Sequence, residues 1–312
     1  MAPRDVIQIT PAAGPDPDAA SRWPEKLERL RAHLVSLGSV VVAYSGGVDS
    51  SVLLRAAHEA LGERALGVIG RSDSYASSEL ALALDQAAGF GARVEVVTTG
   101  ELADPNFASN PANRCYHCKS ELYRKLRGVA EREGARAVLD GTIRDDLGDW
   151  RPGRRAAEEA SVESPLAELG FTKADVRAVA GHYGLSSHDK PASPCLASRI
   201  PYGSEITREK LQAVELAEAG LRRLGFRELR VRHLGDLARI EVPALDIVRL
   251  ADPATRAAAV QALKAAGFLF VTLDLEGFRS GSLNAALRPG ERIVPGAAPE
   301  AQAVVVGRED PK

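Results

Sequence analysis

Val-Val-Val-Ala-Tyr-Ser-Gly-Gly-Val-Asp-Ser-Ser, from Val40 to Ser51, joins an apolar run to a glycine-rich turn. The continuous apolar residues 40–43 are typical of a strand that is buried on both faces of a parallel sheet. Gly46 and Gly47 allow a tight turn that brings backbone amides close to an anion, and a helix follows them. The stretch therefore predicts a strand that ends at a phosphate-binding loop.

Asp49 lies inside this loop, where a carboxylate would repel a phosphate. We therefore expect Asp49 to hold Mg²⁺ beside a triphosphate. The loop is not a Walker A loop, because no Lys follows the second glycine and the glycine spacing differs. Residues Ser45 to Ser50 instead resemble the Ser-Gly-Gly-x-Asp-Ser loop of the PP-loop ATP pyrophosphatases. That resemblance implies cleavage of ATP between the α and β phosphates; the alternative is a glycine-rich turn without a ligand.

The composition is that of an ordinary globular protein. The chain has 312 residues, 45% of them hydrophobic and 26% charged, which is enough for two domains. A net charge of −2 gives no overall electrostatic attraction to nucleic acid or to an anionic membrane. The sequence has neither a run long enough to span a bilayer nor a signal-peptide core, so we expect a cytoplasmic protein.

Strand and helix patterns alternate along the first part of the chain, which predicts a doubly wound parallel sheet. Strands are expected at 40–43, 65–69, 92–97 and 135–139, and helices at 24–37, 52–61, 77–88, 118–133 and 173–182. Ligands of such sheets bind at the carboxyl ends of the strands. We therefore predict an ATP site at that edge, formed by Ser45, Gly46, Gly47, Asp49, Ser50, Ser72 and Gly141.

A second, smaller α/β domain is predicted from the change of pattern near residue 200. Its helices are expected at 207–224 and 253–266, and its strands at 229–232, 238–241 and 269–273. The domain organisation is then a disordered extension at 1–23, a PP-loop domain at 24–200, a C-terminal α/β domain at 201–288 and a flexible tail at 289–312. Residues 144–164 are expected to form a loop, whose Arg151, Arg154 and Arg155 either contact phosphates or face water.

The three cysteines suggest one shared site. Cys115 and Cys118 form a Cys-x-x-Cys pair at the start of a predicted helix, whose dipole is expected to lower the thiol pKa, and Cys195 follows far along the chain. An iron–sulfur cluster bound by all three thiolates is one interpretation, and it leaves one iron open to carry sulfide. A zinc site completed by His117 or His188, a dithiol redox or persulfide pair, and three unrelated buried cysteines are the alternatives.

Further motifs resemble those of LarE-type pyridinium-3,5-bisthiocarboxylic acid mononucleotide synthases, the sulfur-inserting enzymes of nickel-pincer nucleotide biosynthesis. The resemblance covers about residues 25–285 and rests on the loop and on 139–142, 145–146, 149–153, 198–199, 201–203, 271–275 and 277–281. Some members of the family sacrifice one cysteine as the sulfur donor, which falls here at Pro194. Others carry three cysteines and a [4Fe-4S] cluster, a pattern that Cys115, Cys118 and Cys195 match.

The resemblance implies an α/β fold of the adenine nucleotide alpha-hydrolase type, with ATP, Mg²⁺ and a [4Fe-4S] cluster as cofactors. Its implied partners are a carboxylated pyridinium mononucleotide, a sulfide donor and further copies of the chain, with a hexamer as one form of the homo-oligomer. Cys195, Asp49 and Arg199 are the implied catalytic residues, and Arg199, Arg230 and Arg232 the implied substrate-binding residues. Glu218 and Glu241 match acidic metal positions of the family, but a further acidic position is Arg249 here, with Asp246 nearby.

Two other functions compete with this interpretation. Sulfur could come from Cys195 itself as a sacrificial donor. Alternatively, the chain could be a tRNA-thiolating PP-loop enzyme, which would require a basic RNA-binding face that the net charge of −2 does not favour. A ligase of the amidotransferase or NAD-synthetase kind would have no use for the cysteines, and neither would an ATP-binding regulatory module.

Overall fold

The computed structural model describes residues 22–148, 152–279 and 281–282. The predicted N-terminal extension and C-terminal tail therefore fall almost wholly outside the described residues, as does Arg151. No helix within the described ranges is both long enough and apolar enough to cross a bilayer.

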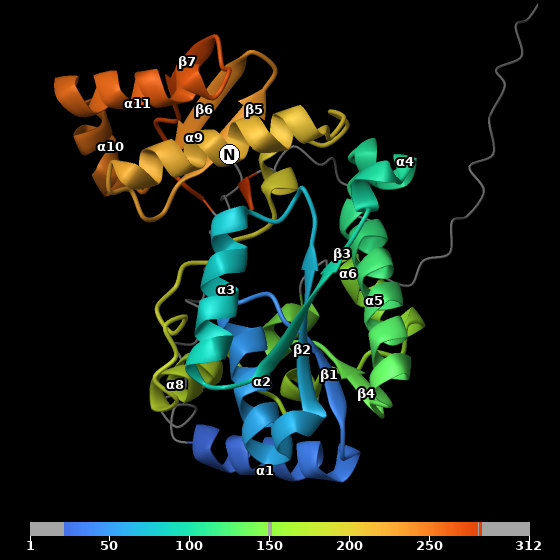
Figure 1. The fold of residues 1–312 in the computed structure, drawn as a ribbon. Helices are drawn as coiled ribbons and strands as arrows, with labels where there is room; N and C mark the ends of the chain where they lie inside the picture. The colour runs from blue at the N-terminus through green and yellow to red at the C-terminus, as the bar shows by residue number, and fades with distance from the viewer. Residues whose placement is uncertain (1–21, 149–151, 280, 283–312) are drawn as a thin grey trace, which may run out of the picture.

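A four-stranded sheet forms the centre of the first part of the chain (Figure 1), and all of its neighbouring strands are parallel. The strands are β1 (Val40–Ala43), β2 (Ala65–Arg71), β3 (Arg93–Thr98) and β4 (Ala137–Leu139), in the order β3-β2-β1-β4. The direction of strand order reverses next to β1, so the loops after β1 and β4 diverge there and leave a crevice. The predicted parallel sheet is confirmed.

Helices cover both faces of this sheet, as a doubly wound fold requires (Figure 1). Val40 and Val42 pack on one face with α1 (Trp23–Leu37), α2 (Val48–Leu61), α3 (Ser77–Gly89), α7 (Pro165–Glu168) and α8 (Lys173–His182). Val41 faces the opposite side, where it packs with α5 (Arg114–Glu133) and α6 (Gly153–Glu159). Burial of successive strand residues on both faces explains the unbroken apolar run 40–43.

Two sequence-based expectations about helices in this part are wrong. Residues 144–164 are not a simple loop, because they contain a 3-10 segment η4 (Arg144–Gly148) and α6. Ala156 and Ala157 supply the buried side of α6, which is too short to show a helical period. Likewise, α5 begins at Arg114 rather than at Cys118, so both residues of the Cys-x-x-Cys pair lie within the helix.

The second part of the chain builds a three-stranded sheet with its own core. Its elements are α9 (Arg208–Arg223), β5 (Arg230–Leu234), β6 (Leu237–Glu241), α10 (Ala244–Ala251), α11 (Pro253–Ala265) and β7 (Phe270–Leu273). β6 lies in the middle, antiparallel to β5 and parallel to β7, and the core packs α9 and α11 against the strands. The sequence predicted these elements except α10. The domain boundary near residue 200 stays a prediction.

Asn110, which follows the short helix α4 (Pro105–Ala108), holds the chain segment around residue 200 in place. Its side-chain amide nitrogen lies 3.2, 2.7 and 3.0 Å from the carbonyl oxygens of Ile200, Pro201 and Ser204. Its side-chain oxygen accepts a hydrogen bond from Arg114, at 3.0 Å. We call this set of contacts the Asn110 clamp. It fixes the segment that follows Cys195 against the start of the helix that carries Cys115 and Cys118.

Candidate active site

The glycine-rich loop connects β1 to α2 in the way that its sequence predicts. Gly47 is the N-cap of α2, which begins at Val48, and its neighbour Gly46 has a φ of 68°. A Cβ atom on Gly46 would lie 2.6 Å from the Cβ of Ala83, so neither the backbone conformation nor the space allows a side chain. Inside the loop, the Ser50 hydroxyl accepts a hydrogen bond from the Ser45 amide at 3.2 Å. The start of α2 therefore offers the amide groups and the positive dipole end that suit an anion.

Gly141 closes this loop from the neighbouring strand. A Cβ atom at Gly141 would lie 2.8 Å from the backbone nitrogen of Ser50 and 3.0 Å from its Cα. The preceding Asp140 is held by hydrogen bonds from Tyr123, from Ser164 and from the Thr142 amide. The end of β4 and the first turn of α2 therefore share one rigid wall.

Replacing Gly141 by Ala is expected to push the first turn of α2 aside and to weaken the binding of ATP by about tenfold or more. Overpacking against backbone costs about 1–3 kcal/mol, and about 1.4 kcal/mol is a factor of ten in affinity. Calorimetric titration with ATP measures the effect. Gly128→Ala is the matched control, because a Cβ there meets nothing within 4 Å. Equal ATP affinity in both variants would contradict the close contact of Gly141 with the loop.

Asp49 has a lysine partner that the sequence did not reveal. Lys173, at the start of α8, donates to both carboxylate oxygens of Asp49, at 2.8 and 2.7 Å. Burial raises the pKa of Asp49, and the nearby Asp146 raises it further, whereas Lys173 lowers it; the net direction is upward. The site therefore holds Asp49 where its charge is costly. Its role as a Mg²⁺ ligand stays a prediction.

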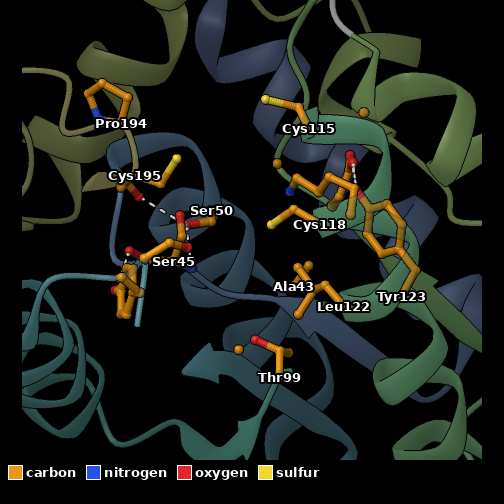
Figure 2. A pocket seen from close by; sticks show the side chains of 18 of the residues that line it. Ala43, Ser45, Ser50, Thr99, Cys115, Cys118, Leu122, Tyr123, Pro194 and Cys195 are labelled. Atoms are coloured by element: carbon orange, nitrogen blue, oxygen red, sulfur yellow. Dashed lines mark hydrogen bonds between the residues drawn. The ribbon is translucent and has the colours of Figure 1, made fainter. Parts of the chain in front are cut away.

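A cavity of about 700 Å³ opens beside the loop and brings most of the predicted site residues together. Its lining includes the predicted nucleotide-binding residues Ser45, Gly47, Asp49, Ser50, Ser72 and Gly141. All three cysteines also line it, and Figure 2 shows Cys195 across the cavity from Cys115 and Cys118, with Ser45 and Ser50 near its floor. Three thiols from two distant segments therefore face the same space as the phosphate-binding loop.

The Cys118 thiol is not activated in the way that its position near a helix start suggested. Burial raises the pKa of Cys118, and the charges of Glu101 and Cys195 raise it further. The expected lowering is therefore wrong for Cys118, because the helix effect fades beyond the first turn and burial outweighs it. Cys118 and Cys195 both pack against one small apolar cluster that contains Phe107 and Leu196.

The cavity has three thiols as possible metal ligands. Among the residues that the structure describes, no group of three or more His, Cys, Asp or Glu side chains is arranged to hold a single metal ion. His117 lies beside Asp104, and His188 lies beside Asp189. Neither histidine lines the cavity, which does not favour the zinc site that one of them would complete. Three thiols around one cavity fit the ligand chemistry of an iron–sulfur cluster, whose irons are bound by cysteine thiolates.

The three arginines predicted to bind substrate are buried and held by protein partners. Arg199 is 1% exposed and forms a two-bond ion pair with Glu218, at 2.8 and 3.0 Å. Arg199 also donates to the backbone carbonyls of Pro194 and Cys195, so it fixes the backbone that carries the third thiol. As ligands of substrate, all three arginines stay a prediction.

Arg230 and Arg232 lie side by side in the second sheet. Arg232 forms a two-bond ion pair with Glu241, at 2.9 and 2.7 Å, and donates to the Ser198 carbonyl. Arg230 donates to the Ala192 carbonyl, and burial lowers its pKa to about 10. Both arginines therefore bind backbone carbonyls of the chain segment 192–198 from their positions in the second sheet.

The acidic residues that match metal positions of the family form ion pairs with arginines in the structure. Glu218 accepts from Arg199 and Arg222, and Glu241 accepts from Arg232 and Arg239. Arg249, which stands at a family acidic position, forms an ion pair with Asp246 at 3.7 Å. In the described part of the chain, the carboxylates of Glu218 and Glu241 are therefore each paired with two arginines.

Sequence reasoning missed several residues of the cavity wall. Lys119, Tyr75 and Glu101 line the cavity without having been predicted, whereas Arg154, a predicted phosphate contact, reaches it from α6. The position of Lys119 directly after Cys118 is a signal in the sequence that could have placed it at the cavity. Arg155 is exposed and pairs with Glu159, so of the predicted phosphate contacts Arg154 and Arg155 only Arg154 lines the site.

The parallel sheet, the Ser45 to Ser50 loop at its switch point and the adjoining cavity define a PP-loop protein with an adenine nucleotide alpha-hydrolase fold. A search of protein-family models finds no match. The chain is 40% identical over 263 residues to the pyridinium-3,5-bisthiocarboxylic acid mononucleotide synthase of Lactiplantibacillus plantarum, covering 83% of this chain and 94% of that protein. It belongs to the family of that synthase.

Two further relatives differ in how much of the chain they match. An uncharacterized protein of Synechocystis sp. is 48% identical over 262 residues, which cover 84% of this chain and 98% of that protein. A tRNA-specific 2-thiouridylase of Xanthobacter autotrophicus is 30% identical over 217 residues, but these cover only 56% of this chain and 55% of that enzyme. The similarity to the synthase therefore extends across both sheets, whereas that to the thiouridylase covers little more than half of the chain.

Proposed function

We propose that this chain is an ATP-dependent sulfurtransferase that converts a carboxylate of a pyridinium mononucleotide into a thiocarboxylate. The observation that carries the proposal is the single cavity lined by both the PP-loop and the three cysteines. The relative named a pyridinium-3,5-bisthiocarboxylic acid mononucleotide synthase supplies the substrate class.

The loop performs the first half of the reaction. The amides of residues 45–50 and the start of α2 bind the phosphates of ATP, with Asp49 as the protein ligand of Mg²⁺. A substrate carboxylate attacks the α phosphate, and pyrophosphate leaves. This step is needed because oxide is a poor leaving group, whereas AMP is a good one. Lys119 and Arg154, which line the same cavity, stabilise the charge that develops on the phosphates.

The thiols serve the second half of the reaction, in which sulfide attacks the acyl carbon and AMP leaves. Cys115, Cys118 and Cys195 would hold a [4Fe-4S] cluster, and such a cluster with one iron unbound by protein can carry an additional sulfide. Arg199 acts on Cys195 by holding its backbone carbonyl. Arg230 and Arg232 bind substrate by giving up their backbone partners at 192–198. A separate sulfide donor reloads the site, and the chain acts as a homo-oligomer.

Anaerobic purification followed by iron and sulfide analysis tests the cysteine set. We expect four irons per chain, lost when any of the three cysteines is replaced by Ser, and retained in the His117→Ala control. Stoichiometric zinc that is lost in His117→Ala would contradict the cluster. Conversion of Cys195 to dehydroalanine during turnover, seen by mass spectrometry, would show sacrificial transfer instead.

A pyrophosphate-release assay tests the substrate class. Release is expected with ATP and a carboxylated pyridinium mononucleotide, and not with tRNA. Release that depends on tRNA would replace this proposal with tRNA thiolation.

A further inference from the structure

Glu101, at the start of the 3-10 segment η3 (Glu101–Ala103), is a buried carboxylate with one uncommitted oxygen. It is 3% exposed and lines the active-site cavity. Its Oε1 accepts a hydrogen bond from the Ser74 hydroxyl at 2.9 Å. Its Oε2 has no hydrogen-bond partner among the described residues. A buried carboxylate oxygen without a partner is costly, and a ligand that supplies positive charge would remove that cost.

The other carboxylates of the cavity already have partners. Asp140 receives three hydrogen bonds, and Asp49 is paired with Lys173. Asp146 accepts from the Ile143 amide, at 3.1 Å. Among the described lining residues, Glu101 is thus the one carboxylate that has an oxygen in need of a partner.

The cations that line the cavity are engaged elsewhere. The Lys119 ammonium lies over the ring of Tyr123, 5.3 Å from the ring centroid. Arg154 donates to the Leu147 carbonyl and lies 3.6 Å from Glu158. Neither is hydrogen-bonded to Glu101, so the described cavity lining offers this carboxylate no cationic partner.

We propose that Glu101 recognises the positive charge of the substrate ring and so determines that a cationic ring is accepted. The inference rests on the proposed function for the identity of the ring as a pyridinium. A quaternary ring nitrogen has no N–H to donate, so it is recognised by charge and not by a hydrogen bond. Glu101 meets that need, because it lines the cavity, keeps one oxygen bound to Ser74 and has a second oxygen without a hydrogen-bond partner among the described residues.

The location of Glu101 suits a ring that must receive sulfur. The next residue, Leu102, packs in the same apolar cluster as Cys118 and Cys195, which places Glu101 at the thiol end of the cavity. Ser74, its partner, also accepts a backbone hydrogen bond from Leu196, next to Cys195. A ring held by Glu101 therefore lies between the thiols and the loop that activates its carboxylates.

Two probes of equal shape and different ring charge test the inference. N-methylpyridinium-3,5-dicarboxylate carries the fixed cation, and 5-methylbenzene-1,3-dicarboxylate is its neutral-ring counterpart. Calorimetric titration of the wild-type chain is expected to show about tenfold tighter binding of the cationic-ring probe, a ratio typical of one charge pair at a partly desolvated site. Glu101→Gln, which keeps the shape and the Ser74 bond, is expected to bring the ratio near one, whereas Glu101→Asp keeps part of it.

Asp140→Asn is the matched control, since it removes an equal charge from the same cavity wall. Its ratio is expected to stay within about twofold of wild type, because the Asp140 oxygens are already bonded. A wild-type ratio near one, an unchanged ratio in Glu101→Gln, or an equal loss in Asp140→Asn would overturn the inference. These titrations need no turnover, so absence of pyrophosphate release would defeat the proposed function while the binding ratio still decides the role of Glu101.

Discussion

Replacing Asp49 by Asn is expected to lower pyrophosphate release by at least about 100-fold without lowering the thermal stability of the chain. The loss follows because the amide cannot replace a carboxylate ligand of Mg²⁺, and a preorganised charge at a phosphoryl group contributes about 10²–10³ in rate. Stability is expected to stay level or to rise, because the raised pKa of Asp49 shows that the folded chain disfavours its charge.

The sign of the pH dependence follows from the same shift. A raised folded-state pKa means that the folded chain binds a proton at Asp49 more tightly than the unfolded chain does. The stability difference between Asp49→Asn and wild type should therefore favour the variant at neutral pH and shrink as the pH falls toward the unfolded pKa of about 3.9. Lys173→Met provides the paired control, since it removes the partner and keeps the carboxylate. Full activity in Asp49→Asn would exclude Asp49 as the magnesium ligand.

Replacing Glu218 by Gln is expected to cost about 3–5 kcal/mol of unfolding free energy, because it breaks a buried ion pair and leaves a cation behind. Glu218 is 0% exposed and accepts bonds from Arg199, Arg222 and the Val231 amide. Arg199 is itself 1% exposed, so water cannot take the place of the lost carboxylate. Urea unfolding measures the change. Glu205→Gln is the control, since Glu205 is exposed and its loss should change the free energy by less than about 0.5 kcal/mol.

The cost of losing Glu218 should depend on pH. Burial alone would raise the pKa of Glu218, but the hydrogen bonds and charge of Arg199 outweigh burial and lower it below its ordinary value of 4.5. The stabilisation is then complete above pH 4.5 and is lost as the pH falls through the lowered pKa. A difference between wild type and Glu218→Gln that is constant down to pH 3 would show that the carboxylate charge is not what stabilises the chain.

Local patterns in the sequence were enough for the first sheet and its loop. A strand is predicted by the apolar run 40–43, and a turn by the paired glycines at 46–47, each from only a few residues. The structure confirms the strand and the turn. The three cysteines could be assigned to one site only by supposing that distant segments meet. They do line one cavity, although how they bind a metal stays a prediction.

The parts that could not be predicted depend on contacts between distant residues. Nothing near Lys173 indicates that it pairs with Asp49, 124 positions earlier. The burial of Arg199 and Arg232 is equally invisible in the sequence, because their carboxylate partners reach them only when the second sheet has formed. Glu101 carries no sequence signal, since its importance comes from an oxygen that the fold leaves without a partner.

The Asn110 clamp has a consequence for the order of events during synthesis. The phosphate-binding loop and its β4 neighbour are complete once Lys173, the partner of Asp49, is available, whereas the clamp joins Asn110 to carbonyl oxygens at 200–204. A growing chain can therefore shape its nucleotide loop while the thiol set is still divided, with Cys115 and Cys118 in place and Cys195 yet to arrive. Under the proposed function, loading of the thiols with iron or sulfur has to follow translation of the clamp, so the two halves of the site mature at different times.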